Sequence, residues 1–198
     1  MLRTGWLTTG VVIVAAGVFA AAEPVSRREA ARLQSKMDRI SRNGSGPRTG
    51  ALRTAITEAE LNSYLRYELV DSIPAGVKDP WVSFPGGGRV SGRAVVDVGQ
   101  VGQGRKSGGL LDPFSFLTGS LPLAVNGILK TKDGVAAFAV ESVSISGVPV
   151  PSWLLQEIVS YYSKSSKAPL GVSIEKPFAL PAGIREIQLD RGQAIVVQ

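Results

Sequence analysis

Two short stretches carry residue types that do chemistry in other proteins. The run from Gly99 to Ser107 has spaced glycines followed by a lysine and a serine, which is close to a phosphate-binding loop. An additional arginine precedes the lysine, however, and two further glycines and Pro113 prevent the helix whose N-terminus would hold the phosphate. We therefore interpret this stretch as a flexible glycine-rich loop.

The second stretch, Ser173 to Lys176, matches the S-x-x-K pattern of serine nucleophiles. That chemistry requires a helical turn to bring the two side chains together. Pro177 and the β-branched neighbours of Ser173 indicate extended chain instead, in which residues three apart point to opposite faces. The pattern does not predict a catalytic pair.

The chain contains no histidine and no cysteine. Histidine-dependent triads, histidine-ligated zinc, thiolate nucleophiles, iron–sulfur clusters and disulfides are therefore excluded. The acidic residues are scattered, without the clusters that hold metals or form acid–base pairs. We predict no catalytic residue, no metal site, no cofactor and no enzymatic activity.

The first 22 residues have the three parts of an export signal. Arg3 supplies the positive start, an apolar run follows from Trp6, and Ala20-Ala21-Ala22 forms a small-x-small cleavage pattern. The same segment is long enough to remain as an uncleaved membrane anchor. The sequence predicts export to the periplasm or cell envelope, with residues 1–22 as signal peptide or anchor.

Residues 23–50 form a basic segment. Residues 23–53 carry eight basic and three acidic side chains, so nearly all of the net charge of +6 resides there and the remaining body is neutral. Residues 25–40 have helix-forming composition, with Leu33, Met37 and Ile40 on one face. Such a helix could lie on anionic lipid headgroups; the alternative is a solvated spacer. The residues predicted to contact the membrane surface are Arg27, Arg28, Arg32, Lys36 and Arg39.

Two further expectations concern this basic segment. Residues 41–47 are rich in Ser, Gly and Asn and end at a proline, which predicts a flexible linker. Nucleic acid is not an expected partner, because no aromatic residue alternates with the basic ones.

The body, residues 51–198, is predicted to be an antiparallel α+β domain. Thr57 and Glu60 form a capping box that starts a helix reaching about Val70, with Leu61, Leu65 and Leu69 on one stripe. A second, more apolar helix is expected over 152–163. The helices do not alternate with the strands, which favours an antiparallel sheet. The expected strands are 51–56, 77–84, 89–98, 121–131, 135–146, 184–189 and 193–197.

The strand over 135–146 is apolar on both faces near its start. Strict alternation places Val143 and Ile145 on the face of Val135, opposite Phe138 and Val140. A strand apolar on both sides has a core on one face and another apolar surface on the other. The Asp133-Gly134 dipeptide before it predicts a tight hairpin.

The segment Ile56–Leu65, which reads ITEAELNSYL, resembles the opening helix motif of bacterial envelope proteins with a TULIP-like fold. Gly147–Pro151 and Leu180–Ile184 are similar to later parts of that pattern, so the resemblance covers residues 51–198. It implies a long, curved antiparallel sheet that wraps around a helix and encloses a hydrophobic tunnel for lipids.

The apolar pattern and this resemblance together predict a lipid-binding interior. Its expected lining residues are Leu61, Leu65, Leu69, Val96, Phe114, Phe116, Phe138, Val140, Trp153, Leu154 and Ile158. The function expected from the sequence is lipid binding or transfer in the cell envelope. The alternative is a tethered accessory or scaffold subunit whose apolar surface docks onto an envelope membrane-protein complex.

Overall fold

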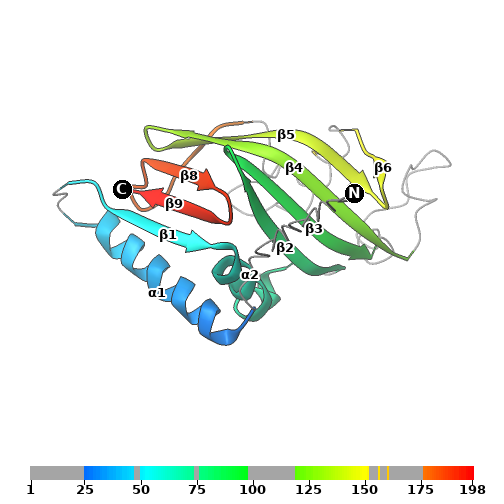
Figure 1. Ribbon diagram of the computed structural model, residues 1–198, viewed down its shortest axis with the longest axis horizontal. Coiled ribbons are helices and arrows are strands. Elements are labelled where there is room, and N and C mark those ends of the chain that lie inside the picture. The colour runs from blue at the N-terminus through cyan, green and yellow to red at the C-terminus, as the bar shows by residue number, and fades with distance from the viewer. Residues whose placement is uncertain are drawn as a thin grey trace, which may run out of the picture.

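The computed structural model describes residues 25–46, 50–73, 76–97, 119–151, 156, 160 and 176–198. Within them the chain has the predicted α+β class, with two α-helices and strands that all pair antiparallel (Figure 1). The elements are α1 (Arg27–Gly44), β1 (Arg53–Thr57), α2 (Glu58–Tyr67), the 3₁₀ turn η1 (Val70–Ser72), β2 (Val77–Gly86), β3 (Arg89–Asp97), β4 (Ser120–Lys132), β5 (Val135–Ile145), β6 (Val148–Pro149), β7 (Phe178–Ala179), β8 (Glu186–Asp190) and β9 (Gln193–Val197).

The strands form two sheets. The larger runs in the order β2-β3-β4-β5-β6, with β7 also paired to β5, and the smaller runs β1-β9-β8. The sheets meet where the tip of the β2–β3 hairpin reaches β8, at the hydrogen bond from Gly88 N–H to the Leu189 carbonyl. The Thr131 hydroxyl of β4 joins them a second time, because it donates to the Ile187 carbonyl and accepts from the Ile187 N–H.

The hydrophobic core lies at this junction. Phe84 of β2, Leu189 of β8 and Ala194 of β9 form its buried centre. Leu61 of α2 packs against the same cluster, which closes the junction from the helical side. Burial of such side chains is the main favourable contribution to folding.

Several local predictions are confirmed. The capping box is present, since the Thr57 hydroxyl accepts from the Glu60 N–H and the Glu60 carboxylate accepts from the Thr57 N–H. Asp133 and Gly134 both have positive φ, as a tight hairpin turn requires. Helix α2 ends at Tyr67, earlier than expected, and Val70 is instead the first residue of η1.

Helix α1 is integrated into the fold more closely than composition predicts. It packs on α2 and β1 and buries Ala30, Leu33 and Ile40, whereas Met37 stays 40% exposed. It also continues to Gly44, so the first four residues of the expected linker are helical. The reason is tertiary: Gly44 lies so close to the Ala182 carbonyl that any Cβ there would collide with it.

Strand β5 contains a β-bulge that corrects the predicted alternation. Asn126 of β4 pairs with Ser142 and Gly127 pairs with Val140, so Glu141 is an extra residue. The bulge shifts the later part of β5 by one position. Val143 and Ile145 therefore share the face of Phe138 and Val140, not that of Val135. The other face of this strand includes the exposed Glu141 and Ser142.

As a result, the large sheet has one nearly continuous apolar face. Cross-strand partners point to the same side, and the register carries this face from Val82 and Phe84 of β2 across β3, β4 and β5. Its members in the last three strands are Val90, Gly92, Ala94 and Val96; Leu121, Leu123, Val125, Gly127, Leu129 and Thr131; and Ala136, Phe138, Val140, Val143 and Ile145.

Candidate functional site

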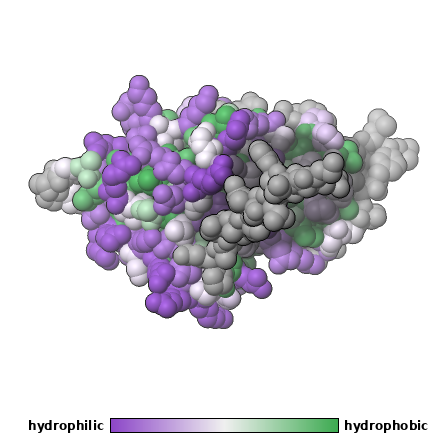
Figure 2. All heavy atoms as spheres, viewed as in Figure 1, coloured by the Kyte–Doolittle hydropathy of each residue, from purple (hydrophilic) through white to green (hydrophobic). Residues whose placement is uncertain are grey.

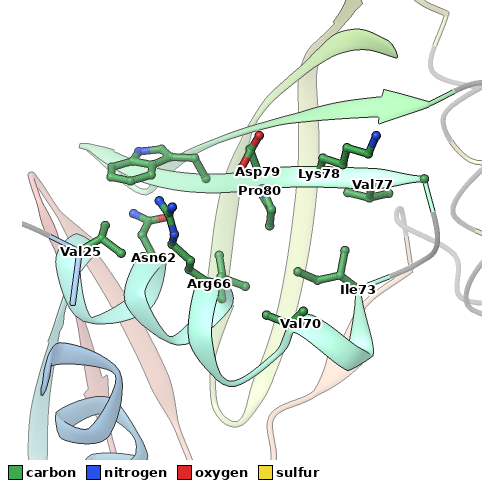
Figure 3. A pocket seen from close by; sticks show the side chains of 12 residues that line it. Val25, Asn62, Arg66, Val70, Ile73, Val77, Lys78, Asp79 and Pro80 are labelled. Atoms are coloured by element: carbon green, nitrogen blue, oxygen red, sulfur yellow. The ribbon is translucent and has the colours of Figure 1, made fainter. Parts of the chain in front are cut away.

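A pocket of about 440 Å³ lies between α2, η1 and the start of β2 (Figure 3). Its lining combines apolar side chains with a few polar ones, which is the composition of sites for small amphipathic ligands. The lining residues are Val25, Asn62, Leu65, Arg66, Val70, Ile73, Gly76, Val77, Lys78, Asp79, Pro80 and Trp81.

Asn62 fixes the distance between the two walls of the pocket. Its side chain is 2% exposed and pairs with the free edge of β2 as a strand would. The Asn62 amide donates to the Val82 carbonyl (2.7 Å) and its oxygen accepts from the Val82 N–H (2.7 Å). Glu58, one turn earlier, accepts from the Phe84 N–H. These bonds hold α2 against β2 and satisfy backbone groups that would otherwise be buried unpaired.

The β2 wall is bent by a second irregularity. The β2–β3 register shifts between Lys78 and Trp81, and Asp79 has φ +48°, a conformation unusual for a non-glycine residue. Pro80 follows and has no N–H to donate. In Figure 3 Pro80 points toward α2, whereas Lys78 and Asp79 project from the other side of β2. The bend thus separates an apolar inner wall from a charged rim.

The start of α1 completes the pocket. Val25 lies in its lining, and the Ser26 N–H donates to the Ser63 hydroxyl (3.1 Å), which fixes this end of α1 on α2. The Arg27 guanidinium lies 5.0 Å from the centre of the Tyr67 ring, at the end of α2. The first residues after the predicted leader are therefore part of the pocket wall.

The pocket shares one residue, Val77, with the apolar face of the large sheet. Val77, in the lining, is the cross-strand partner of Val96, and Val96 pairs in turn with Leu121 of β4. All three side chains are partly buried. An apolar ligand that enters the pocket would thus meet a surface that extends across several strands.

The residues predicted to bind lipid fall into three groups. Leu65 lines the pocket, whereas Leu61 packs on the core and Leu69 is a partly buried residue before η1. Val96, Phe138 and Val140 lie on the apolar face of the large sheet. The others, which lie outside the described residues, are Phe114, Phe116, Trp153, Leu154 and Ile158. The second predicted helix is also largely outside them, although Gln156 and Ser160 are both helical.

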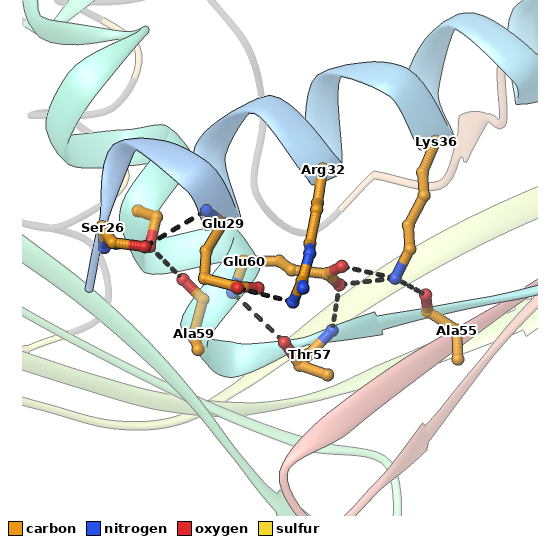
Figure 4. Close-up of polar contacts among 9 residues, drawn as sticks. Ser26, Glu29, Arg32, Lys36, Ala55, Thr57, Ala59 and Glu60 are labelled. Atoms are coloured by element: carbon orange, nitrogen blue, oxygen red, sulfur yellow. Dashed lines mark hydrogen bonds and ion pairs between the residues drawn. The ribbon is translucent and has the colours of Figure 1, made fainter. Parts of the chain in front are cut away.

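The residues predicted to contact the membrane surface also fall into groups, some exposed and some engaged by other side chains. Arg28 and Arg39 are exposed, and Arg32 is exposed but paired with Glu29 at 2.6 Å. Lys36 points into the molecule, where its ammonium donates to Glu60 and to the Ala55 carbonyl, both at 2.7 Å (Figure 4). The Lys36 ammonium is therefore already paired with the buried Glu60 carboxylate. Arg27 lies against Tyr67.

Sequence reasoning missed most of the pocket. Asn62 is a polar residue inside an apolar helical stripe, and Asp79-Pro80 interrupts a predicted strand. Both were available signals, because a buried polar residue and a proline in a strand each require a special arrangement. No such signal marks Val70, Ile73 or Trp81. Their place in the pocket lining depends on where η1 and β2 meet.

Comparisons with known proteins add no family. No protein-family model matches the sequence, and no curated protein matches it significantly. Across the part of the chain that the structure describes, no helix is long and apolar enough to cross a membrane.

Proposed function

We propose that this chain is an exported, non-catalytic protein of the cell envelope that binds or transfers lipid. The observation that carries the proposal is the pocket beside α2, whose apolar lining includes Val77, a residue that also belongs to the apolar face of the sheet. Each methylene of an acyl chain buried there would contribute about 0.8 kcal/mol. A chain of ordinary length therefore needs no charged anchor to be held.

The rim of the pocket suits an amphipathic ligand. Arg66 and Lys78 are cationic and exposed, and Asp79 is the neighbouring anion. The apolar wall would take an acyl chain and the rim would take a polar headgroup. The TULIP-like interpretation is based on the Ile56–Leu65 motif and on the long antiparallel sheet with one apolar face, and α2 lies beside β2, the edge strand of that sheet.

A docking function is the second candidate, and a different surface favours it. Val135 and Phe178 are 46% and 49% exposed at the edge where β5 pairs with β7, on opposite faces of that edge. Apolar side chains exposed at one place on a surface often mark protein interfaces. An accessory subunit tethered through its leader could present this edge to an envelope membrane-protein complex.

A pair of matched variants tests the lipid proposal. Val70 and Val135 are exposed valines, 56% and 46% respectively, but only Val70 lines the pocket, and Val135 lies on the face of β5 opposite the apolar face. Val70→Asp places a charge where an acyl chain would lie, and Val135→Asp makes the same change away from it. The exported protein is purified without detergent and examined by native mass spectrometry and solvent extraction.

We expect the wild type and Val135→Asp to carry a discrete mass that extracts as lipid. The occupancy of Val70→Asp should be lower by about tenfold or more, because burying an unpaired charge costs a few kcal/mol. A wild-type protein that stays free of lipid after incubation with envelope lipids would overturn the proposal. Equal occupancy of the two variants would exclude this pocket as the site.

A further inference from the structure

The exposed face of α1 carries a stripe of arginines. Arg28, Arg32, Arg39 and Arg42 are all exposed. With 3.6 residues per turn they fall within an arc of about 80° and extend over about 21 Å of helix. Figure 2 shows hydrophilic side chains along the edge of the molecule that α1 forms in Figure 1. We call these four residues the arginine stripe.

The arginine stripe is largely uncompensated. Among the described residues Arg28, Arg39 and Arg42 make no ion pair or side-chain hydrogen bond. The two acidic residues of α1 lie beside the stripe and are engaged: Glu29 pairs with Arg32, and Asp38 accepts from Gln34. An exposed pair such as Arg32–Glu29 contributes little and can exchange with another anion. The stripe is therefore complementary to an extended anionic surface.

The opposite face of α1 is not available to a membrane. Ala30, Leu33 and Ile40 are buried against the body, and Lys36 is held by Glu60. The helix thus cannot insert an apolar face between lipids as a free amphipathic helix does. Any contact of α1 with a bilayer must be electrostatic and confined to the headgroups.

The position of the leader indicates which anionic surface this is. The predicted membrane-directed segment ends at Ala22, and Val25 already lines the pocket. The three peptide units between them span at most about 11 Å. While the leader is in the membrane, the start of α1 and the pocket must therefore lie close to the headgroups.

We infer that the arginine stripe docks α1 flat on an anionic phospholipid bilayer and so holds the pocket beside the headgroups. The orientation itself does not depend on lipid binding. Only its purpose, which is to place the pocket next to a source of lipid, rests on the proposed function. The attraction of each arginine to an anionic leaflet falls off within a Debye length, so the stripe must lie at the headgroups to act.

The absence of cysteine allows a direct test on the full chain. Ser35→Cys places a single thiol within the stripe, and Ser142→Cys places one on the outward face of β5. The chain is reconstituted with vesicles of phosphatidylcholine, with or without about 30% phosphatidylglycerol. The rate of labelling by a membrane-impermeant maleimide is compared between the two vesicles.

The thiol of Ser35→Cys should label about tenfold more slowly on the anionic vesicles, whereas that of Ser142→Cys should label equally on both. High salt should remove the difference. Arg28→Glu with Arg39→Glu should also remove it. The control Lys130→Glu with Lys132→Glu makes the same change of charge at exposed sites on β4 and should preserve it. Thermal unfolding by circular dichroism is measured for each variant, to show that the comparison is between folded proteins.

Equal labelling of the Ser35→Cys variant on both vesicles would overturn the inference and would assign the stripe to another anionic partner. Loss of protection in the β4 control as well would also overturn it, because net charge alone would then explain the effect. Lipid retention is measured on separate, vesicle-free preparations of the same variants, purified without detergent. Retained lipid without protection of the α1 thiol rejects the docking inference alone, and protection without retained lipid rejects the proposed function alone.

Discussion

The two halves of helix α2 use the same residue type for different purposes. Leu61 packs on the buried cluster of Phe84, Leu189 and Ala194, whereas Leu65, one turn later, lines the pocket. The difference comes from the surroundings of the helix. The smaller sheet covers the first turn, and the bend of β2 moves the strand away from the last one. A leucine stripe on a helix therefore need not be core along its whole length.

This comparison predicts that changes at the junction alter stability and changes at the pocket alter binding. Phe84→Ala should have the largest effect on folding. Phe84 is 5% exposed at the centre of the junction, and truncation of a buried phenylalanine costs about 3–5 kcal/mol. Urea unfolding measures the loss. A cost below about 1 kcal/mol would mean that the junction is not the core.

Breaking the buried ion pair of α1 should have the next largest effect. Lys36→Met leaves the carboxylate of Glu60, which is 3% exposed, without its cation. The Lys36 side chain is 26% exposed, so the expected cost is about 1–3 kcal/mol rather than that of a fully buried pair. Adding Glu60→Gln should restore part of the loss. Urea unfolding of both variants gives the comparison.

Asn62 links the two regions and sharpens the comparison. Asn62→Ala leaves the Val82 N–H and carbonyl without these partners, at a cost of about 1–3 kcal/mol. It should also lower lipid retention, because the pocket walls lose their spacing. Asn62→Asp keeps the acceptor but buries a carboxylate against the Val82 and Glu58 carbonyls, so it should destabilise the fold more than Asn62→Ala does. Unfolding and lipid extraction are measured on the same preparations.

Val70→Asp should have the smallest effect on stability, within about 0.5 kcal/mol, because it changes an exposed residue. If it destabilises the fold as much as Phe84→Ala does, the pocket is part of the core and the contrast between the two regions fails. Thermal unfolding of Val70→Asp, compared with that of Val135→Asp, gives the check.

Much of the secondary structure could be predicted from short patterns. The Thr57–Glu60 capping box, the Asp133-Gly134 turn and the strands β2, β3, β4, β5, β8 and β9 depend on neighbouring residues, so short patterns predict them; the two-residue strands β6 and β7 were not expected. The extra residue at Glu141 could not be predicted. A bulge depends on a partner strand, here on Gly127, where any Cβ would collide with the Phe138 ring.

The candidate site was predicted in part. Leu65, Val96, Phe138 and Val140 were each expected to line an apolar interior, but the continuous apolar face was not expected, because the bulge at Glu141 brings Val143 and Ile145 onto it. The pocket walls were not expected, because Val25, Val70 and Trp81 come together only through the packing of α1, η1 and β2. The basic segment shows the same limit: its composition is visible, but not that Lys36 turns inward to Glu60.

The sequence by itself determined the neutral body, the basic segment, the absence of histidine and cysteine chemistry and most of the local elements. These depend on composition or on residues a few positions apart. The tertiary structure decided which apolar side chains are core and which line a pocket, and which arginines of α1 face solvent. The physical reason is that burial and charge pairing are set by partners distant in the chain, such as Glu60 for Lys36 and Val82 for Asn62.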